Sequence, residues 1–398
     1  KLKQIATKAK RDTTSWQPVV VDMSQPHAEE TLQQLLEREP IESIVDDYDE
    51  QYAELLVSRS AELYQTPYED KLKVLDTELA QHHADSDAWR KGSWVYYPWS
   101  KTLVHVIAKD LFLELRTTRN RNLITADEQK RLGEFNVGCA GMSVGSNAAL
   151  SVGITGISQQ LKLADGAVIN GSNLNRVLAG VSDIGLSKSL IIARKLYEMN
   201  PYLTISRFST DITPENIADF FDTPWPLHAV VDEIDNLMVK VMLRIEARKR
   251  RLPVVMVTDL GDSAMLDVER YDLDENLPLF HGLVDGVEDL LTRPGDRREF
   301  LRYAMEIIGP ENASVRVQES LMQIGRDIAV QPQLGGSAIM SGAVVAYALR
   351  KIALGEDIKS GRTIISLDDQ LLEYVSTDAY HAEHAEKTAQ IRQMLGLE

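Results

Sequence analysis

The stretch that decides the fold reads Val137-Gly-Cys-Ala-Gly-Met-Ser-Val-Gly-Ser-Asn147. An apolar run, Phe135–Ala140, leads into it and predicts a strand, and the residues that follow predict a helix to about position 158. Gly141 and Gly145 let the backbone turn tightly and approach a phosphate, and the start of the helix offers free N–H groups to an anion. The stretch therefore predicts a nucleotide-binding turn between a strand and a helix.

Two departures leave the kind of nucleotide open. Ser143 and Ser146 occupy positions where a dinucleotide-binding fingerprint has glycine. No Gly-Lys-Ser/Thr follows, so the stretch is not a P-loop. The turn by itself fits NAD and ATP equally well.

Strands and helices alternate from residue 134 to residue 272, which is the pattern of a mostly parallel sheet. The expected strands are Phe135–Ala140, Gln160–Ala164, Leu203–Phe208, Ala229–Asp232 and Pro253–Thr258. The expected fold class is therefore α/β, a doubly wound, Rossmann-like sheet with helices between its strands. A ligand of such a sheet lies beyond the carboxyl ends of the strands.

The part before this sheet predicts a smaller α+β domain over residues 1–110. It mixes short strands with a long polar helical stretch at 50–81 and a hairpin around Pro98-Trp99-Ser100. The aromatic residues of that hairpin form either a binding face or the core of a small domain.

Residues 111–398 form the predicted nucleotide-binding domain, with its core at 134–272 and further helices over 284–398. Within these, Gly335–Leu354 is rich in small residues and predicts a buried core helix. Its small and polar residues argue against a membrane span, although its length would allow one.

Composition restricts the class of protein. The net charge of −17 argues against general nucleic-acid binding, which needs a positive surface. The only cysteine, Cys139, excludes disulfide frameworks and four-cysteine zinc sites within one chain. His381 and His384 have helical spacing, and we expect them on a solvated helix face. The cytoplasm is the expected compartment, with no membrane association.

Polar residues that follow the strands indicate a phosphate-rich ligand. Asp165 ends the second strand, where such folds hold a ribose hydroxyl pair. Arg176 and Lys188 are cations that can neutralise phosphate oxygens, a need that an NAD site does not have. Asp235, after the fourth strand, can hold Mg²⁺ that bridges phosphates. The alternative is that the two cations simply lie on the surface, and their spacing does not exclude it.

The Gly-rich turn, Asp165, Ser172-Asn-Leu-Asn-Arg176, Lys188 and Val231-Asp-Glu-Ile-Asp-Asn236 together resemble the ThiF/MoeB/E1 superfamily. Its members adenylate a carboxylate, typically the C-terminus of a ubiquitin-like protein. The resemblance covers about residues 112–272 and, less clearly, 331–355.

The resemblance implies roles for particular residues. It implies that Gly141 and Gly145 shape the ATP site, and that Asp165 binds the ribose. Contacts to the phosphates are implied for Asn173, Arg176 and Lys188, and Asp235 would serve Mg²⁺.

A second arginine of the family's N-terminal segment reaches into the ATP site of a partner subunit. Arg116-Thr-Thr-Arg119-Asn looks like that segment. The resemblance thus implies a homodimer with Arg119 acting across the interface, and Arg121 is a second choice for this role.

Departures from the family narrow the chemistry. Ala167 stands where the family has a second acid, and the paired Cys-x-x-Cys zinc sites are absent, so we expect no zinc. No cysteine stands where a thioester or persulfide nucleophile would be, and Cys139 is expected to be buried. The acyl adenylate would then be trapped by a nitrogen or oxygen nucleophile, unless another protein supplies a thiol.

The N-terminal zone, with Trp94-Val-Tyr-Tyr-Pro-Trp-Ser100, resembles the extension of a bacterial ThiF-like group. Enzymes of the microcin C and pantocin type also carry an N-terminal peptide-binding domain and lack a catalytic cysteine. The preferred hypothesis is therefore ATP-dependent activation of a peptide or small-protein carboxylate in peptide-antibiotic maturation, with a leader peptide held by the N-terminal domain.

Two alternatives stay open. One is a degenerate E1-like scaffold that binds a partner protein, which Ala167 and the glycine-poor turn favour. The other is an NAD(P)-binding oxidoreductase, which would leave Arg176, Lys188 and Asp235 without a role.

Overall fold

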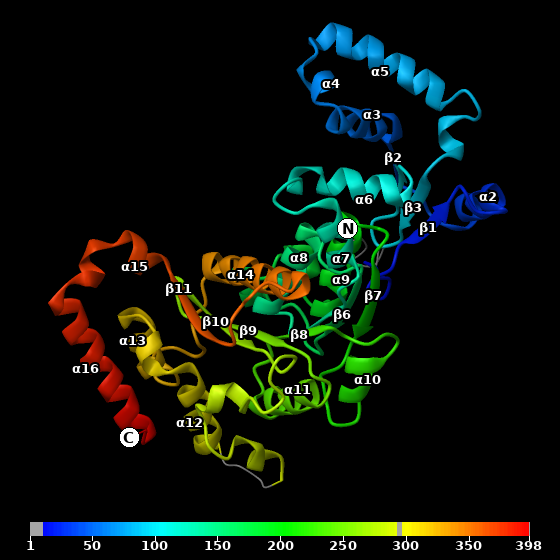
Figure 1. Ribbon diagram of the computed structural model, residues 1–398. Helices are drawn as coiled ribbons and strands as arrows, with labels where there is room; N and C mark the ends of the chain where they lie inside the picture. The colour runs from blue at the N-terminus through cyan, green and yellow to red at the C-terminus, as the bar shows by residue number, and fades with distance from the viewer. Residues whose placement is uncertain (1–10, 293–296, 398) are drawn as a thin grey trace, which may run out of the picture. The chain divides into compact units, whose positions relative to one another are not determined.

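The computed structural model describes residues 11–292 and 297–397 of the chain (Figure 1). It forms two compact units, one made of the residues up to 128 together with 193–203, the other of residues 129–192 and 204–398. The sequence analysis instead places a boundary at residue 110. The first ten residues of the predicted N-terminal domain lie outside the described part.

The N-terminal unit contains a four-stranded sheet in the order β1-β3-β4-β2. Its strands are β1 (Val19–Asp22), β2 (Ser43–Asp46), β3 (Ser93–Tyr97) and β4 (Thr102–Val106). The predicted hairpin is present, since β3 and β4 pair in antiparallel fashion around Pro98-Trp99-Ser100. β1 adds to β3 in antiparallel fashion, and β2 adds to β4 in parallel fashion.

The helices of this unit are α2 (Ala28–Arg38), α3 (Tyr48–Arg59), α4 (Ala61–Gln65), α5 (Tyr68–His82) and α6 (Lys109–Thr117). The long polar stretch thus forms three helices rather than one. Ser60 ends the first and caps the second, because its Oγ accepts a hydrogen bond from Leu63 N at 3.0 Å. Pro67 separates the second from the third, because proline lacks the N–H that a continuing helix needs.

Packing explains why this unit continues beyond residue 110. Leu111, Phe112 and Leu115 of α6 lie against a buried cluster that contains Tyr48 and Leu55 of α3. Burial of this apolar face ties α6 to the residues before it.

The larger unit is built on a seven-stranded sheet in the order β11-β10-β9-β8-β5-β6-β7. Five of its strands run parallel: β5 (Val137–Ala140), β6 (Gln160–Ala164), β7 (Thr204–Phe208), β8 (Ala229–Asp232) and β9 (Val254–Asp259). This is the doubly wound, mostly parallel α/β sheet that the sequence predicts.

Two antiparallel strands at one edge are missing from the sequence-based prediction: β10 (Ser263–Glu269) and β11 (Gly361–Ser366). All of β10 is buried, including two acids. Asp267 pairs with Arg362 at 3.0 Å, and Glu269 pairs with Arg244 at 2.6 Å. These partners come from distant parts of the sequence. From its local sequence alone, a buried strand that contains two acids therefore looks polar and exposed.

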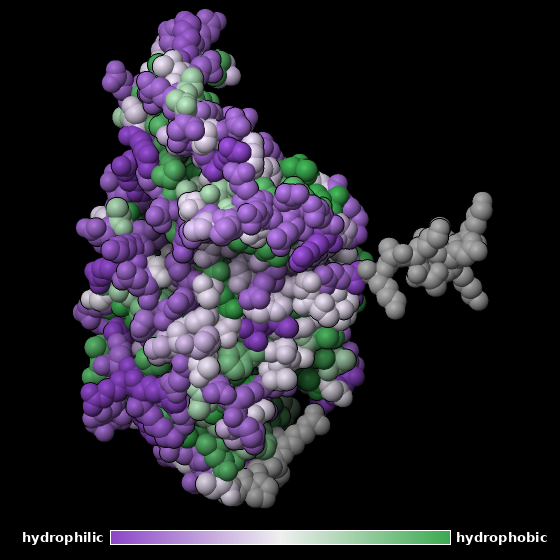
Figure 2. Space-filling model, turned by 90° about the vertical axis from the view of Figure 1, so that its right-hand side faces the viewer, coloured by the Kyte–Doolittle hydropathy of each residue, from purple (hydrophilic) through white to green (hydrophobic). Residues whose placement is uncertain are grey.

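The remaining helices are α7 (Ala126–Gly133), α8 (Val144–Thr155), α9 (Lys188–Met199), α10 (Ile217–Asp222), α11 (Leu237–Lys249), α12 (Arg297–Ile308), α13 (Val315–Gln323), α14 (Gly335–Leu354), α15 (Leu367–Leu371) and α16 (Asp378–Leu395). Side chains of α10 and α11 form one core cluster with β8 and β9, in which Phe220, Leu243 and Val254 are fully buried. The face shown in Figure 2 is mostly hydrophilic, with small hydrophobic patches.

α14 occupies the predicted range and packs along α8 and across β9 and β10 (Figure 1). Gly342 permits this close approach, because a Cβ there would lie 2.5 Å from Asn147 O. Within the described residues it is the one helix that is long and apolar enough to cross a membrane, and half of its apolar stretch is buried in the unit.

Candidate active site

The order of the strands locates the site. The chain moves from β5 through β6 to β7, then returns to the other side of β5 to form β8 and β9. The strand order reverses at the carboxyl ends of β5 and β8, and ligands of such sheets bind at that edge. The Gly-rich turn follows β5 at this point, and Glu233 follows β8.

The two glycines of the turn are required by its contact with Glu233. Gly141 has φ +90°, and a Cβ there would lie 2.3 Å from Glu233 O. A Cβ at Gly145 would lie 2.9 Å from Glu233 Cβ. The turn therefore lies directly on the residue after β8, a packing reason that the sequence analysis did not foresee.

Asp165 fixes the same turn from the end of β6. Its Oδ2 accepts a hydrogen bond from Met142 N at 2.7 Å, and its Oδ1 accepts one from Ala167 N at 2.7 Å. The carboxylate is half-buried, and each oxygen keeps a second lone pair. Such a group can still accept a hydrogen bond from a hydroxyl of a ligand.

Arg176 lies over the Gly-rich turn. Its Nε donates to Ser143 Oγ at 3.2 Å, and its Nη1 donates to Ser172 O at 2.9 Å. Asn147, near the start of α8, fixes the backbone of Arg176, because its Nδ2 donates a hydrogen bond to Arg176 O at 2.8 Å. Ser143, which departs from the glycine fingerprint, is therefore one of the residues that position this guanidinium, together with Ser172 and Asn175.

Asn173 and Lys188 flank Arg176 and Asp165. Asn173 is buried, and its Oδ1 accepts a hydrogen bond from Asn170 N at 2.9 Å, which shapes the short helix η3 (Gly171–Asn173). Lys188 opens α9, and its backbone N donates to Ala167 O at 3.0 Å. Lys188 is half-buried, and this bond places it beside the loop that follows Asp165.

Three acids lie at the carboxyl end of β8, and they differ in whether a ligand can reach them. Asp232 is buried and forms ion pairs with Arg244 at 2.5 Å and Lys240 at 3.3 Å. Glu233 Oε1 accepts a hydrogen bond from Val257 N at 2.8 Å, and burial raises the pKa of this carboxyl to about 8. Asp235 is exposed next to Asn236, which caps α11. Asp235 is thus the carboxylate here that fits Mg²⁺, a cation that takes one or two carboxylates and completes its shell with phosphates and water.

Residues 117–289 match the model of the ThiF family. This segment is a ThiF-family domain.

Curated relatives cover different parts of the chain. An uncharacterized protein of Mycobacterium tuberculosis (strain CDC 1551 / Oshkosh) is 37% identical over 278 residues, 70% of this chain and 38% of the relative. The tRNA threonylcarbamoyladenosine dehydratase of Bacillus subtilis (strain 168) is 25% identical over 253 residues, 60% of this chain and 96% of the relative. A probable molybdopterin-synthase adenylyltransferase of Porphyra purpurea is 31% identical over 115 residues, 28% of this chain and 29% of the relative. The chain spans well under half the length of the first of these relatives.

Solved structures that resemble the chain include PaaA, with a TM-score of 0.44 and 19% identity over 65% of this chain and 77% of that one. The Escherichia coli protein MccB, solved with ATP, has a TM-score of 0.41 and 16% identity over 61% of this chain and 63% of that one.

Cys139 of the ThiF domain is fully buried in β5. Burial raises the pKa of its thiol to about 12. A nucleophilic cysteine needs the thiolate form and access to its substrate, so this thiol has neither. Within residues 11–292 and 297–397, no group of three or more His, Cys, Asp or Glu side chains is arranged to hold a metal ion.

Arg119 belongs to the N-terminal unit. It lies on the short helix η2 (Thr118–Asn120) with an exposed side chain. Arg121 donates to Ser58 O at 3.3 Å within the same unit. The second compact unit therefore gathers the other predicted site residues around the strand ends: Gly141, Gly145, Asp165, Asn173, Arg176, Lys188 and Asp235.

Sequence reasoning missed Asp259 of the ThiF domain. This acid ends β9, the strand beside β8, and it is 7% exposed. The predicted strand stops one residue earlier, at Thr258. An acid directly after an apolar run at the carboxyl edge was the available signal, the same one that drew attention to Asp165.

Proposed function

We propose that this chain uses ATP and Mg²⁺ to adenylate a carboxylate on a peptide or small protein. The observation that carries the proposal is the hydrogen bond from Arg176 Nε to Ser143 Oγ. It holds a guanidinium over the Gly-rich turn at the switch point, where the start of α8 also attracts an anion. A cation fixed there stabilises the negative charge that develops on a leaving pyrophosphate.

The neighbouring residues supply the rest of a nucleotide site. Asp165 offers acceptors for ribose hydroxyls, and Asn173 and Lys188 lie beside it for the phosphates. Asp235 would hold Mg²⁺, which neutralises phosphate charge when it is bound. Because Cys139 is buried and protonated, the acyl adenylate passes to a nitrogen or oxygen nucleophile.

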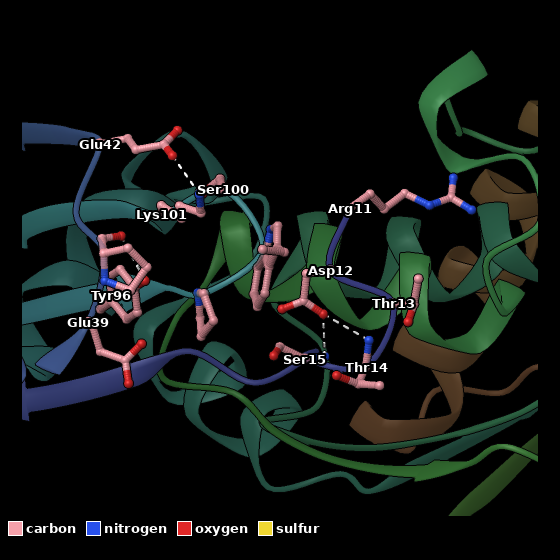
Figure 3. Close-up of a pocket in the computed structure, with 13 residues that line it drawn as sticks. Arg11, Asp12, Thr13, Thr14, Ser15, Glu39, Glu42, Tyr96, Ser100 and Lys101 are labelled. Carbon is pink, nitrogen blue, oxygen red and sulfur yellow. Dashed lines mark hydrogen bonds and ion pairs between the residues drawn. The ribbon is translucent and has the colours of Figure 1, made fainter. Parts of the chain in front are cut away.

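The N-terminal unit offers a groove for the peptide (Figure 3). Its volume is about 740 Å³, and it lies between the segment 11–15 and the turn that joins β3 to β4. Trp99 stands in it, held by a hydrogen bond from its Nε1 to Glu198 at 2.6 Å and by the guanidinium of Arg194, 5.3 Å from its ring centre. A fixed aromatic side chain with charged neighbours suits a leader peptide of a maturing peptide antibiotic.

A pyrophosphate-exchange assay across candidate peptides tests the activity. Lys188→Ala and Asp235→Ala should each lower exchange by about 10²-fold or more, since each removes charge stabilisation from the transition state. Asp357→Asn, an exposed acid after α14, is the matched control and should leave exchange unchanged. Exchange that persists in both site variants contradicts the assignment, and ATP binding without exchange favours the scaffold alternative.

The groove is tested by titrating a candidate leader peptide against the wild-type chain and Trp99→Ala. Loss of this aromatic side chain should weaken peptide binding by about tenfold or more while ATP binding stays the same. Equal peptide affinity in both proteins rejects the groove as the peptide site.

The names of two relatives give tRNA as the second candidate substrate. The Bacillus subtilis and Escherichia coli relatives are named tRNA threonylcarbamoyladenosine dehydratases. The net charge of −17 disfavours a polyanionic substrate. Total tRNA belongs in the same exchange screen, and stimulation by tRNA rather than by peptides would select that alternative.

A further inference from the structure

Asp259 is a buried carboxylate without a hydrogen-bond partner. Neither of its side-chain oxygens accepts a hydrogen bond in the described part of the chain. The Ser337 hydroxyl and the backbone N–H of Gly261 lie near it and lower its pKa, but the Ser337 hydroxyl donates its hydrogen bond to Ser263 O at 3.0 Å. A buried acceptor left unpaired costs free energy, and a charged one costs the most. Stability of the fold therefore does not account for an acid at this position.

The position of Asp259 relates it to the ATP site. It ends β9 on the same carboxyl edge of the sheet as the Gly-rich turn, and the first turn of α14 lies against it. That turn also touches the backbone before Arg176, because a Cβ at Gly335 would lie 2.3 Å from Asn175 O. Burial raises the pKa of the Asp259 carboxyl. The Ser337 hydroxyl, the backbone N–H of Gly261 and the charge of Arg176 oppose this rise, and the charge of Asp262 adds to it.

An acidic cavity begins two residues after Asp259. Its volume is about 720 Å³, and its lining includes four acids (Asp262, Glu319, Asp368 and Glu383) and one arginine, Arg316. Burial and the charges of Asp262 and Asp369 raise the pKa of the Asp368 carboxyl, and the charge of Arg316 opposes part of the rise. Two acids that repel each other in this way are stabilised by a bound cation.

We propose that Asp259 receives the amino group that takes the acyl chain, and that the acidic cavity draws this amine in as an ammonium ion. The proposal rests on the adenylation proposed above and names the acceptor class.

Other partners fit Asp259 less well. A phosphate has only acceptors at neutral pH and would be repelled. A second Mg²⁺ keeps several bound waters, and a carboxylate that is only 7% exposed leaves little room for them. An alcohol offers a hydrogen-bond donor, but the acidic cavity would not concentrate it. A primary amine fits both, because it donates a hydrogen bond to Asp259 and because its protonated form is attracted to the acidic cavity.

The step balances without another reagent. The ammonium ion first gives one proton to the Asp259 carboxylate, which frees the nitrogen lone pair. The lone pair attacks the carbonyl carbon of the acyl adenylate, and the C–N bond forms. The bond from that carbon to the phosphate oxygen breaks, and AMP leaves with the electron pair. The second proton released from nitrogen goes to the phosphate of the departing AMP, so the products are an amide, AMP and protonated Asp259.

Two half-reactions separate this role from adenylation. With a peptide that supports exchange, Asp259→Asn should keep pyrophosphate exchange within about twofold and lower amide formation with methylamine by about 10²-fold or more. Hydroxylamine, which is neutral at pH 7, should be used by the variant nearly as well as by the wild type. Loss of exchange together with amide formation, or an equal loss with both nucleophiles, overturns the proposal.

The cavity is tested by the double variant Asp262→Asn/Asp368→Asn. It should raise the KM for methylamine while kcat, and the use of hydroxylamine, stay unchanged. An unchanged KM overturns the role of the cavity, and Asp357→Asn is the charge-matched control.

A third measurement needs no acyl substrate. Asp259→Asn should raise the Tm, because it removes a buried unpaired charge, whereas a structural acid would lower the Tm when replaced. Methylammonium chloride should raise the Tm of the wild type relative to sodium chloride at equal ionic strength, and should not do so in the variant. A lowered Tm in the variant, or no methylammonium effect in the wild type, overturns the proposal. Failure of adenylation itself would show only as absent exchange in the wild type.

Discussion

Gly141 and Gly145 show how one contact dictates two residues. Each lies against Glu233, but the contacts differ in kind. Gly141 meets backbone atoms and has a positive φ, whereas Gly145 meets side-chain carbons. The backbone cannot yield at the first position, and the side chain can shift at the second.

Replacing these glycines should therefore destabilise the chain to different degrees. Gly145→Ala should lower the free energy of unfolding by about 1–3 kcal/mol through crowding. Gly141→Ala should lower it further, because the left-handed backbone alone costs about 1–2 kcal/mol. Urea unfolding measures both.

Gly336→Ala is the control, since a Cβ there meets nothing within 4 Å and the residue is helical. It should stabilise the chain by about 0.4–1 kcal/mol. A ranking in which Gly141→Ala is the mildest change would contradict the packing described here.

Ser143 marks the limit of pattern matching at this scale. As a missing glycine it counts against a nucleotide site, yet in the structure it accepts the hydrogen bond of Arg176. The two residues are separated by more than thirty positions, so their meeting depends on how the loop before α9 folds back over the turn.

At the scale of elements, β6 places a lysine side chain, Lys162, in the core of the unit. Lys162 is fully buried, and its Nζ donates to Phe220 O at 2.8 Å. Burial lowers the pKa of this amine to about 8, and the charges of Asp222 and Asp219 oppose the change. The folded chain thus binds this proton more weakly than the unfolded chain does.

Lys162 should make stability rise with pH. Between about pH 8 and pH 10.4 the unfolded lysine keeps a proton that the folded one has released, so the free energy of unfolding rises by at most about 1.4 kcal/mol per pH unit. Lys162→Met should remove this rise and should stabilise the chain below pH 8. Urea unfolding of both proteins from pH 7 to pH 10.5 measures it, and parallel curves would exclude the lysine as the cause.

The strands of this unit also show what a local pattern can predict. Each parallel strand is a short apolar run bounded by turn residues, so its own sequence predicts it. β10 is not predicted, because Asp267 and Glu269 are compatible with burial only when Arg362 and Arg244 reach them. Arg362 belongs to β11, which lies almost a hundred residues further along the chain.

At the scale of the whole molecule, the proposed site residues are divided between the two compact units. Arg119 belongs to the N-terminal unit, and the others belong to the second unit. We propose, as the family resemblance implies, that a second copy of the chain brings Arg119 to the ATP site of its partner.

Mixing two inactive variants tests this arrangement. Arg119→Ala and Lys188→Ala should each be inactive in pyrophosphate exchange. In a mixed dimer, one of the two sites combines an intact Lys188 with an intact Arg119 from the other copy, so an equal mixture should regain about a quarter of wild-type exchange. Co-refolding before the assay allows subunits to exchange. No recovery, with dimers present by light scattering, rejects action across the interface.

The sequence by itself determined the parallel α/β core, the Gly-rich turn and the positions of Asp165, Arg176, Lys188 and Asp235 near strand or helix ends. These follow from short-range patterns of apolar runs, glycines and charges. The tertiary structure alone decided which acids remain available. Asp232 is taken up by Arg244, Asp235 is exposed, and Asp259 is buried without a partner. The availability of a carboxylate depends on which residues surround it in space, and distant segments supply those residues.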